Sequence, residues 1–305
     1  MKSRKGRPRI YHDCPCCDRC KKNDEVVAFG RRKNKMKTKQ VFYCNRCLHK
    51  FTPDDGFKNV LYTPEIIMEA LALYVRGLSG REVSNHMREF KEVTVGETTV
   101  LRWVKTYGGK IADFDRNVRP KVKGRIHNDE VVLKVKGKKC YSINAIDSVT
   151  KFNIETYFTE HRDKESFRQF FKNIKAKIND QVMEIYKEEK KKKKEERKLV
   201  TFVSDKLEQY KDAFNKYFYR TAKLVHGVPI ACRKYGLQHN NTVERHNQFI
   251  GRRCDLMRGF KDGNSAATFL SLNRVYYNYI RPHSSLSWGT PAEAAGINLH
   301  FEGNP

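Results

Sequence analysis

The sequence predicts an α/β protein in which two small modules precede a larger domain built on a sheet. Three observations predict this organisation. Two Cys-x-x-Cys pairs lie near the N-terminus, and residues 63–107 carry apolar side chains at helical spacing. After residue 124, strand-like and helix-like segments alternate. We therefore expect three domains, at residues 1–58, 59–112 and 122–297.

The first module is expected to hold a structural zinc ion. Cys14-Pro-Cys-Cys17 and Cys44-Asn-Arg-Cys47 can each turn two thiolates toward one ion, as in a basic zinc ribbon. Four sulfurs complete the coordination shell and leave no position for a reactive water. Cys17 and Cys20 form a competing pair, but the proline that follows Cys14 favours Cys14 with Cys17. A strand is expected at residues 41–43.

The second module begins with two short helices. Thr63 and Pro64 suit the N-cap and first position of a helix, which Gly77 is expected to end. Ser79 and Glu82 have the spacing of a capping box, which predicts that a second helix begins there.

A third helix is expected from residue 97 or 98 to about Tyr107, where Gly108-Gly109 would stop it. Three short helices with a tight turn suggest a helix-turn-helix, although any three-helix bundle has the same periodicity. The third helix would be the one that contacts DNA, and its candidate contact residues are Thr98, Thr99, Arg102 and Lys105.

The third region has the element order of a ribonuclease H-like fold of the retroviral-integrase type. Three strands come first, then a helix, and then strands and helices alternate. The expected strands are 130–135, 140–147, 152–158, 200–204 and 222–225, and the expected helices 164–178, 207–219 and 242–253.

That layout lets three acids converge from the first strand, the end of the fourth strand and a late helix. Asp129, Asp205 and Glu244 occupy those places. Carboxylates are the ligands that Mg²⁺ or Mn²⁺ prefers, and two such ions can assist phosphoryl transfer without a protein nucleophile. The sequence therefore predicts Asp129, Asp205 and Glu244 as the catalytic, metal-binding residues.

Other residues of this region are given structural roles. Asp147 is expected to be a turn or structural residue, and Arg281-Pro-His283 to pack the end of the domain. His246 is either a residue that orients the metal site or DNA, or a surface histidine. The lysine-rich run at about 185–198 is expected to be a solvated insertion. Cys140, Cys232 and Cys254 are expected to be ordinary thiols.

The charge of the chain indicates a polyanionic partner. Its 305 residues contain 62 Lys and Arg against 35 Asp and Glu, a formal net charge of +27. Nucleic acid is the most common partner for such a charge. No apolar run is long enough to span a membrane, and no apolar stretch follows the basic N-terminus as in a secretory signal. Six clustered cysteines indicate metal in a reducing compartment, so we expect a cytoplasmic, nucleoid-associated protein without membrane contact.

Several segments resemble insertion-sequence DDE transposases of prokaryotes, most closely the family-six type with a zinc ribbon and a helix-turn-helix. The segments are Asp129–Gly137 with Ala145–Asp147, Asn240–His246, Arg252-Arg253, Met257–Lys261, Tyr276–His283 and Thr290–Glu293. The resemblance extends from about residue 14 to 297. One departure is Lys206, which follows the second acid where these transposases often have glycine.

The resemblance implies metal-dependent cleavage of DNA and transfer of the cut strand. Double-stranded DNA, as terminal repeats of the element and as target, would be the partner, and the protein would act as a homodimer or higher oligomer. Arg252, Arg253 and Arg258 would contact phosphates. Two alternatives are a transposase-derived DNA-binding protein without catalysis and a ribonuclease H-like nuclease that cuts without joining.

Overall fold

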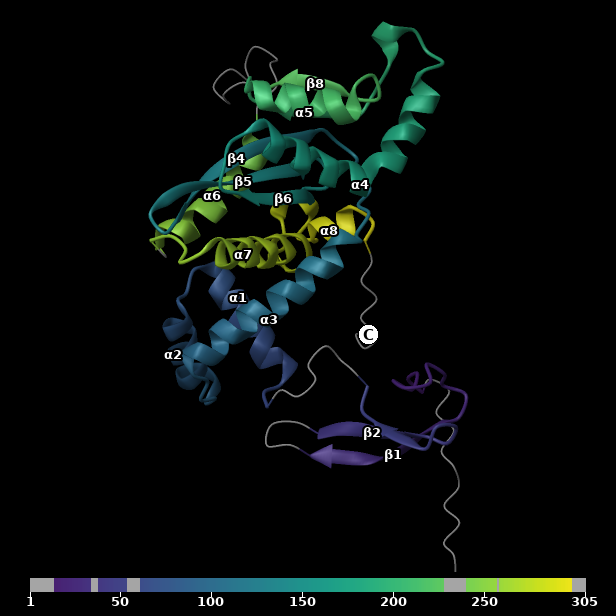
Figure 1. The fold of residues 1–305 in the computed structure, drawn as a ribbon, viewed down its shortest axis with the longest axis vertical. Coiled ribbons are helices and arrows are strands. Elements are labelled where there is room, and N and C mark those ends of the chain that lie inside the picture. The colour runs from purple at the N-terminus through teal and green to yellow at the C-terminus, as the bar shows by residue number, and fades with distance from the viewer. Residues whose placement is uncertain (1–13, 34–37, 54–60, 228–239, 257, 298–305) are drawn as a thin grey trace, which may run out of the picture. The chain divides into compact units, whose positions relative to one another are not determined.

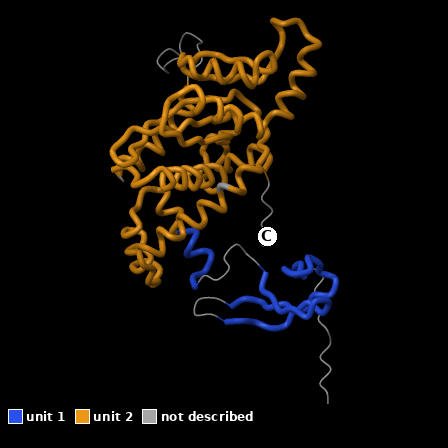
Figure 2. The backbone as a smooth tube through the Cα atoms, in the orientation of Figure 1, with its two compact units in different colours: residues 1–69 blue, residues 70–305 orange. Residues whose placement is uncertain are grey.

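The structure, a computed structural model, describes residues 14–33, 38–53, 61–227, 240–256 and 258–297. Cys232 and Met257 lie outside the described residues. The chain divides into two compact units, residues 1–69 and residues 70–305 (Figure 2). Within the described residues, no helix has the length and apolar character needed to cross a membrane.

Unit 1 contains a small antiparallel sheet. Its strands β1 (Val26–Lys33), β2 (Thr38–Cys44) and β3 (His49–Phe51) are paired in that order. The strand predicted at residues 41–43 is confirmed as part of β2. Val26 and Phe51 pack with Cys17 and Cys44 in a small apolar cluster. A core this small suits a module that is held together by bound metal.

Three helices follow, α1 (Pro64–Arg76), α2 (Gly80–Lys91) and α3 (Glu97–Arg116). The predicted start of α1 at Pro64 and the capping box of Ser79 and Glu82 at α2 are confirmed. Gly77, which follows α1, has a φ of +131°, a conformation open to glycine.

The predicted end of α3 near Tyr107 is wrong, because the helix continues through Gly108-Gly109 to Arg116. Gly108 lies against Thr268 of α7 (Gly263–Val275) so closely that a Cβ would be 2.5 Å from the Thr268 Cγ2. The packing of α3 on α7 therefore requires glycine and outweighs its low helix propensity.

The main sheet has five strands in the order β6-β5-β4-β7-β8. The first three strands along the chain are antiparallel, and β7 and β8 run parallel to β4. This topology confirms the predicted ribonuclease H-like fold. The strands are β4 (Ile126–Val135), β5 (Lys138–Asp147), β6 (Asn153–Thr159), β7 (Thr201–Ser204) and β8 (Lys223–His226).

Helices cover both faces of this sheet (Figure 1). α4 (Lys164–Glu189) and α5 (Glu208–Phe218) lie on one face, and α6 (Asn241–Leu256) and α7 lie on the other. A π-helical turn (Tyr276–Ile280) follows α7, and a short helix α8 (Pro291–Ala294) comes near the end of the described chain.

The two faces of the sheet differ in chemistry. Aromatic side chains of α4, α5 and β7 form the core on the first face, and ring contacts such as Phe171 on Phe202 fill it. On β5, Ile143 and Ala145 belong to that core. Asn144 lies between them and points to α6 on the other face, as the alternation of a strand requires. The face that carries the candidate site is therefore polar.

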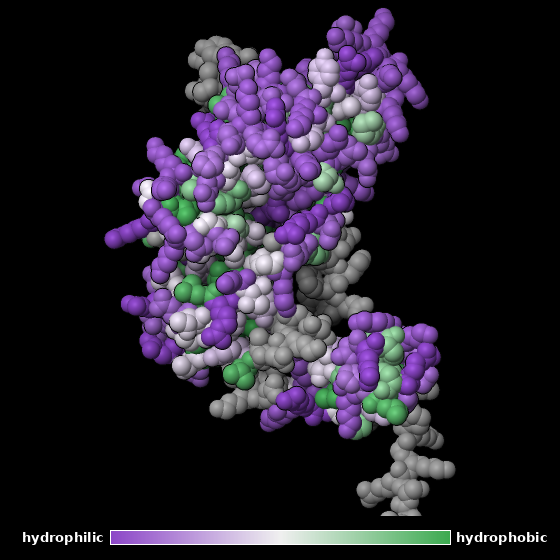
Figure 3. Space-filling model, in the orientation of Figure 1, coloured by the Kyte–Doolittle hydropathy of each residue, from purple (hydrophilic) through white to green (hydrophobic). Residues whose placement is uncertain are grey.

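The lysine-rich insertion begins as an extension of α4, which ends at Glu189, and includes a 3-10 turn (Lys194–Glu196). Glu189 accepts hydrogen bonds from the Lys192 ammonium and the Lys198 backbone amide, which closes the insertion on itself. Hydrophilic side chains cover this end of α4 on the face shown (Figure 3).

A buried cluster of four charges joins α3 to the sheet domain. Asp115 of α3 and Glu155 of β6 both pair with Lys177 of α4 and Arg274 of α7. The Lys177 ammonium lies 3.0 Å from each carboxylate, and all four residues are at most 8% exposed. Two acids and two bases leave the cluster neutral, so each charge depends on the others for compensation.

Replacing Arg274 with methionine is expected to lower the free energy of unfolding by about 3–5 kcal/mol, because it leaves a buried negative charge without a partner. Urea denaturation followed by circular dichroism would measure it. Arg116→Met is the control, since Arg116 and its partner Asp113 are each more than 70% exposed. Equal stability of the Arg274 variant and the wild type would contradict the role given to the cluster.

Candidate active site and cysteine cluster

The first two predicted acids lie at neighbouring positions on parallel strands. In the register of β4 and β7, Ile126 pairs with Phe202 and His127 with Val203. Asp129 and Asp205 each come two residues after that last pair, so both lie at the same edge of the shared ladder. One Asp205 carboxylate oxygen accepts from the Leu207 amide at 3.0 Å, a turn that leads into α5.

Asp129 is in an environment that disfavours negative charge. Burial, the neighbouring Glu130 carboxylate and, more weakly, Asp205 raise the pKa of Asp129 to about 7. Asn247 opposes this shift by donating a 2.9 Å hydrogen bond to Asp129. Glu130 faces other partners, since it accepts from the Tyr210 hydroxyl and pairs with Arg162. A cation bound beside Asp129 would therefore stabilise its ionised carboxylate and lower its pKa.

The third acid, Glu244, is on the first turn of α6, and a cap holds the start of that helix against β4. The Glu244 amide donates to the Asn240 carbonyl. Asn240 Oδ1 accepts from His127 Nδ1 at 3.0 Å, and Asn240 Nδ2 donates to the Asn128 carbonyl at 2.9 Å. These bonds fix the first turn of α6 beside the strand that carries Asp129.

A second amide link lies one turn further along α6. Asn247 donates to Asp129 Oδ2, and its own Oδ1 accepts from Asn144 of β5 at 2.8 Å. Asn247 comes three residues after Glu244, so the two share a side of the helix. Neither Asn240 nor Asn247 was predicted from the sequence as a positioning residue. The sequence did contain the pattern, because Asn240 is four residues before Glu244 and Asn247 is three residues after it, which places both amides on the same helix face as Glu244.

His246 is not a surface residue, since it is 2% exposed. Its Nε2 is 2.9 Å from Asn153 Nδ2 of β6, and its ring meets Tyr277 edge-on. Burial lowers the pKa of His246 to about 3, so the ring is neutral. Tyr277 also contacts His283, which confirms that Arg281-Pro-His283 packs the end of the domain.

Asp147 has the structural role that was predicted. It is 1% exposed and accepts hydrogen bonds from the backbone amides of Lys123 and Val149 and from the Thr150 hydroxyl. With its oxygens occupied in this turn, it is not available to a metal site.

The three predicted acids do not form a closed cage. Among the described residues, only a cysteine group has all its ligand atoms within 4.8 Å of one another. None of Asp129, Asp205 and Glu244 forms an ion pair with a described lysine or arginine. Hard oxygen donors without a basic partner fit a divalent cation.

A family model described as a DDE domain matches residues 123–283, more than half of the chain. The matched range includes all three acids and the amides that hold α6. The chain belongs to this DDE-domain family.

The curated relatives of this DDE domain are transposases of Staphylococcus aureus. Those for the insertion sequence-like element IS431mec and for IS257 in transposon Tn4003 are each 29% identical over 119 residues. The alignment covers 39% of this chain, and the chain spans about half the length of these relatives, 52%. Among solved structures, the magnesium complex of the HTLV-2 integrase catalytic core is 14% identical, with a TM-score of 0.33. That match covers 57% of this chain and 97% of the integrase core.

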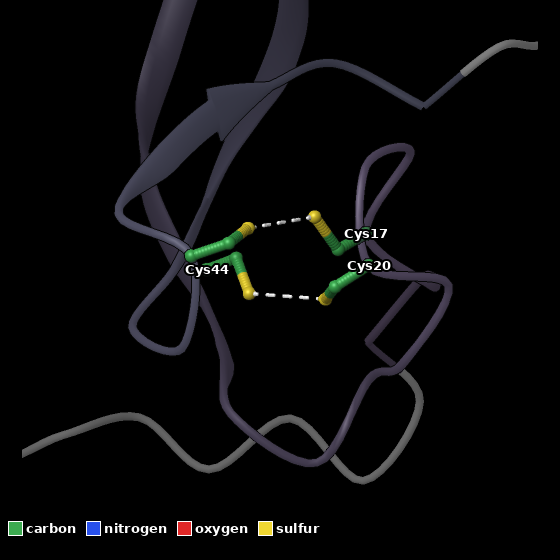
Figure 4. A group of neighbouring side chains, drawn as sticks. Cys17, Cys20 and Cys44 are labelled. Carbon is green, nitrogen blue, oxygen red and sulfur yellow. Dashed lines mark hydrogen bonds between the residues drawn. The ribbon is translucent and has the colours of Figure 1, made fainter.

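Earlier in the sequence than the DDE domain, four cysteines of unit 1 form a compact group. This group differs by one residue from the zinc ligands predicted from the sequence. The group consists of Cys17, Cys20, Cys44 and Cys47, and the favoured ligand Cys14 is not part of it. The Cys17 and Cys47 sulfurs are 3.5 Å apart and the Cys20 and Cys44 sulfurs 3.6 Å apart (Figure 4). Four sulfurs at this spacing match the donor set of a tetrahedral soft-metal site.

The two cysteine turns repeat one geometry, which explains the choice of Cys20. Lys21 and Leu48, which directly follow the second cysteine of each turn, have φ values of +59° and +52°. The sequence carries the same repeat, because Cys17-Asp-Arg-Cys20 matches Cys44-Asn-Arg-Cys47 in all but one similar residue. The proline after Cys14 was therefore a weaker signal than this internal match.

The predicted DNA-contact residues divide into exposed and buried ones. Thr98, Arg102 and Lys105 are exposed along one side of α3, and Thr99 is half-buried. Arg252 and Arg258 are also exposed.

The prediction that Arg253 contacts phosphates is wrong, because this residue is 3% exposed. Its guanidinium donates to the carbonyls of Gly77 and Leu78 and lies over the Tyr74 ring at 4.5 Å. Arg253 thus joins the end of α6 to the turn between α1 and α2.

Asn240→Ala is expected to lower the free energy of unfolding by about 1–3 kcal/mol, because it removes two buried hydrogen bonds, one with the His127 ring and one to the Asn128 carbonyl. Chemical denaturation would measure the change. Asn241→Ala is a matched control, since Asn241 is half-buried and its side chain makes no hydrogen bond with the described residues. Equal losses in the two variants would show that the link from Asn240 to β4 is unimportant.

Proposed function

We propose that this protein is a transposase that cleaves DNA at the ends of a mobile element and joins the cut strand to target DNA. The observation that carries the proposal is that Asp129 in β4 and Asp205 directly after β7 lie at equivalent places beyond the paired residues of these parallel strands, and that α6, the helix of Glu244, donates to Asp129 through Asn247. The membership of the DDE-domain family over residues 123–283 supports it.

Asp129, Asp205 and Glu244 would hold two Mg²⁺ or Mn²⁺ ions. Bound there, such ions supply activation of the attacking oxygen and stabilisation of the leaving oxygen. The chain's own part is to fix three carboxylates. Asn247 orients Asp129 by a direct hydrogen bond, and Asn240 fixes the turn of α6 that presents Glu244. Neutral amides do this without adding charge to compete with the ions.

The reaction has two displacements at phosphorus. In the first, a water oxygen bonds to the phosphorus at the element end, and the phosphodiester bond to the 3′ oxygen breaks to leave a 3′-OH. In the second, that hydroxyl oxygen bonds to a phosphorus of target DNA and the target strand breaks. The attacking group loses one proton in each step, and no oxidant or covalent protein intermediate is needed.

The DNA partners are the terminal repeats of the element and a double-stranded target. Thr98, Thr99, Arg102 and Lys105 of α3 would contact the repeats, and Arg252 and Arg258 would contact phosphates. Joining two ends in one complex requires at least a homodimer. The protein would work where its substrate is, at the nucleoid. The net charge of +27 supports binding to DNA of any sequence.

A structural Zn²⁺ ion is proposed to bind in unit 1, with Cys17, Cys20, Cys44 and Cys47 as its four ligands. Their four sulfurs would enclose the ion fully, so it would stabilise unit 1 and take no part in the reaction. Unit 1 has only a small apolar cluster of its own, which supports a stabilising role for the ion.

Asp129→Asn, Asp205→Asn and Glu244→Gln are each expected to lower strand transfer at least about a thousandfold, because each loses a ligand charge worth several kcal/mol in the transition state. The assay is joining of a labelled duplex with the element's terminal repeat to a plasmid in Mn²⁺.

Terminal-repeat binding by the same three variants should stay within about twofold of the wild type. Glu165→Gln, a change on α4 at a 74% exposed side chain, is the control and should transfer normally. Strand transfer by Glu244→Gln at the wild-type rate would refute the assignment. Tight repeat binding without cleavage by the wild type would instead indicate a DNA-binding protein without catalysis.

Cys20→Ser is expected to lose most bound zinc and to lower the melting temperature of unit 1, because it removes one of four ligands. Cys14→Ser is the matched control and should keep about one zinc ion per chain, as the wild type would. Metal analysis of the purified proteins measures both. Loss of zinc from Cys14→Ser but not from Cys20→Ser would restore the ligand set first expected from the sequence.

A further inference from the structure

A groove with a volume of about 1070 Å³ lies within unit 2, away from the three acids. Its walls come from α3, from the β4–β5 turn at Lys136-Gly137 and from the loop at 258–262. Leu101 of α3 and Leu256 of α6 line it and are 42% and 69% exposed. The groove therefore joins the helices that precede the DDE domain to the far end of its central strand.

The loop at 258–262 is held firmly against that strand. Phe260 donates to the Lys134 carbonyl at 2.7 Å and accepts from the Lys136 amide at 2.9 Å, which extends β4 by a parallel bridge. Gly259 has a φ of +104°, and a Cβ there would be 2.7 Å from the Lys134 carbonyl oxygen. Only glycine fits this contact. Arg258 and Lys261 therefore flank Gly259 and Phe260, the two residues that are fixed against β4.

The charges around the groove are unbalanced in favour of the bases. Its three acids have structural partners, since Glu82 closes the capping box of α2, Asp262 caps α7 and Glu97 is 3.6 Å from Arg81. Five bases line it, and four of them are exposed: Lys105, Lys136, Arg258 and Lys261, whereas Arg253 is buried. None of the four exposed bases forms an ion pair with any residue that the structure describes. The groove thus offers four exposed cations from three separate elements, and more bases than acids line it.

We propose that this groove binds the sugar-phosphate backbone of duplex DNA and holds an element end at a second point, apart from the acids. The proposal rests on the proposed function. Lysine and arginine at fixed positions are the groups that contact phosphates without regard to sequence. Lys105 belongs to this groove and also to the exposed side of α3, so one duplex contacts both.

The fold sets the distance between the groove and the acids. Along β4, seven residues separate Asp129 from Lys136, which is about 23 Å at about 3.3 Å per residue. Along α6, twelve residues separate Glu244 from Leu256, which is about 18 Å at about 1.5 Å per residue. A span of about 20 Å corresponds to about six base pairs at 3.4 Å each. On a duplex that runs along β4 and α6, the groove contact therefore falls about six base pairs from the cut, inside the repeat that α3 contacts.

The first test compares two variants that lose equal charge. Lys136→Gln with Arg258→Gln alters the groove, and Lys172→Gln with Lys211→Gln alters exposed lysines of α4 and α5. Binding of the full chain to two duplexes of about 30 base pairs, one with the terminal repeat and one random, is measured between about 50 and 200 mM salt.

The groove variant should bind both duplexes about tenfold more weakly, and its plot of log affinity against log salt should have a slope smaller by about two. The control variant should match the wild type. If both variants match the wild type while strand transfer persists, the groove proposal is wrong and the proposed function stands. If the wild type binds neither duplex, both fail.

A second measurement tests the position of the contact. Ethylation of single phosphates in the terminal-repeat duplex should weaken binding of the wild type about six base pairs inside the cut, and the groove variant should lose this effect. Interference only at other positions would overturn the proposed placement. A changed oligomeric state of the groove variant with an unchanged salt slope would make the groove a protein interface instead.

Discussion

The candidate site depends on how α6 is fastened to the sheet. Asp129 is in strand β4 and Asp205 directly follows strand β7, but Glu244 is on a helix that shares no backbone hydrogen bonds with these strands. Side chains must therefore set its position. Asn240, just before α6, and Asn247, about two turns further along, do so by bonds to β4 and β5. Each amide both donates and accepts, so one residue links two partners and specifies direction as well as distance.

The use of amides also determines the electrostatics of the site. A lysine or arginine in place of Asn247 would pair with Asp129 and neutralise it. The amide orients the carboxylate and leaves its charge largely uncompensated, which is why burial and nearby acids can raise the pKa of Asp129 to about 7. The chain as a whole carries +27, so this negative point is a local exception in a basic protein. Cations and the DNA backbone are thus attracted to different parts of one molecule.

Sequence patterns predicted the sheet because its strands alternate in a regular way and end in recognisable turns. The order of strands and helices along the chain, the places of Asp129 in the first strand and Asp205 after the fourth, and the helix that carries Glu244 followed from that pattern. The patterns failed where tertiary contacts outweigh local preference. Gly108 predicted a helix end, yet its contact with Thr268 keeps α3 continuous. Arg253 was placed on DNA because of its charge, and only the fold reveals the carbonyls and the ring that enclose it.

The continuous helix α3 has a mechanical consequence. One end of it packs on α2, and the other carries Asp115 into the buried charge cluster with Arg274 and Lys177. Bending between these ends would separate buried charges or part α3 from α7 at Gly108. The helix therefore connects α2 rigidly to the sheet domain, and a displacement of α2 is expected to displace α7 and the sheet with it.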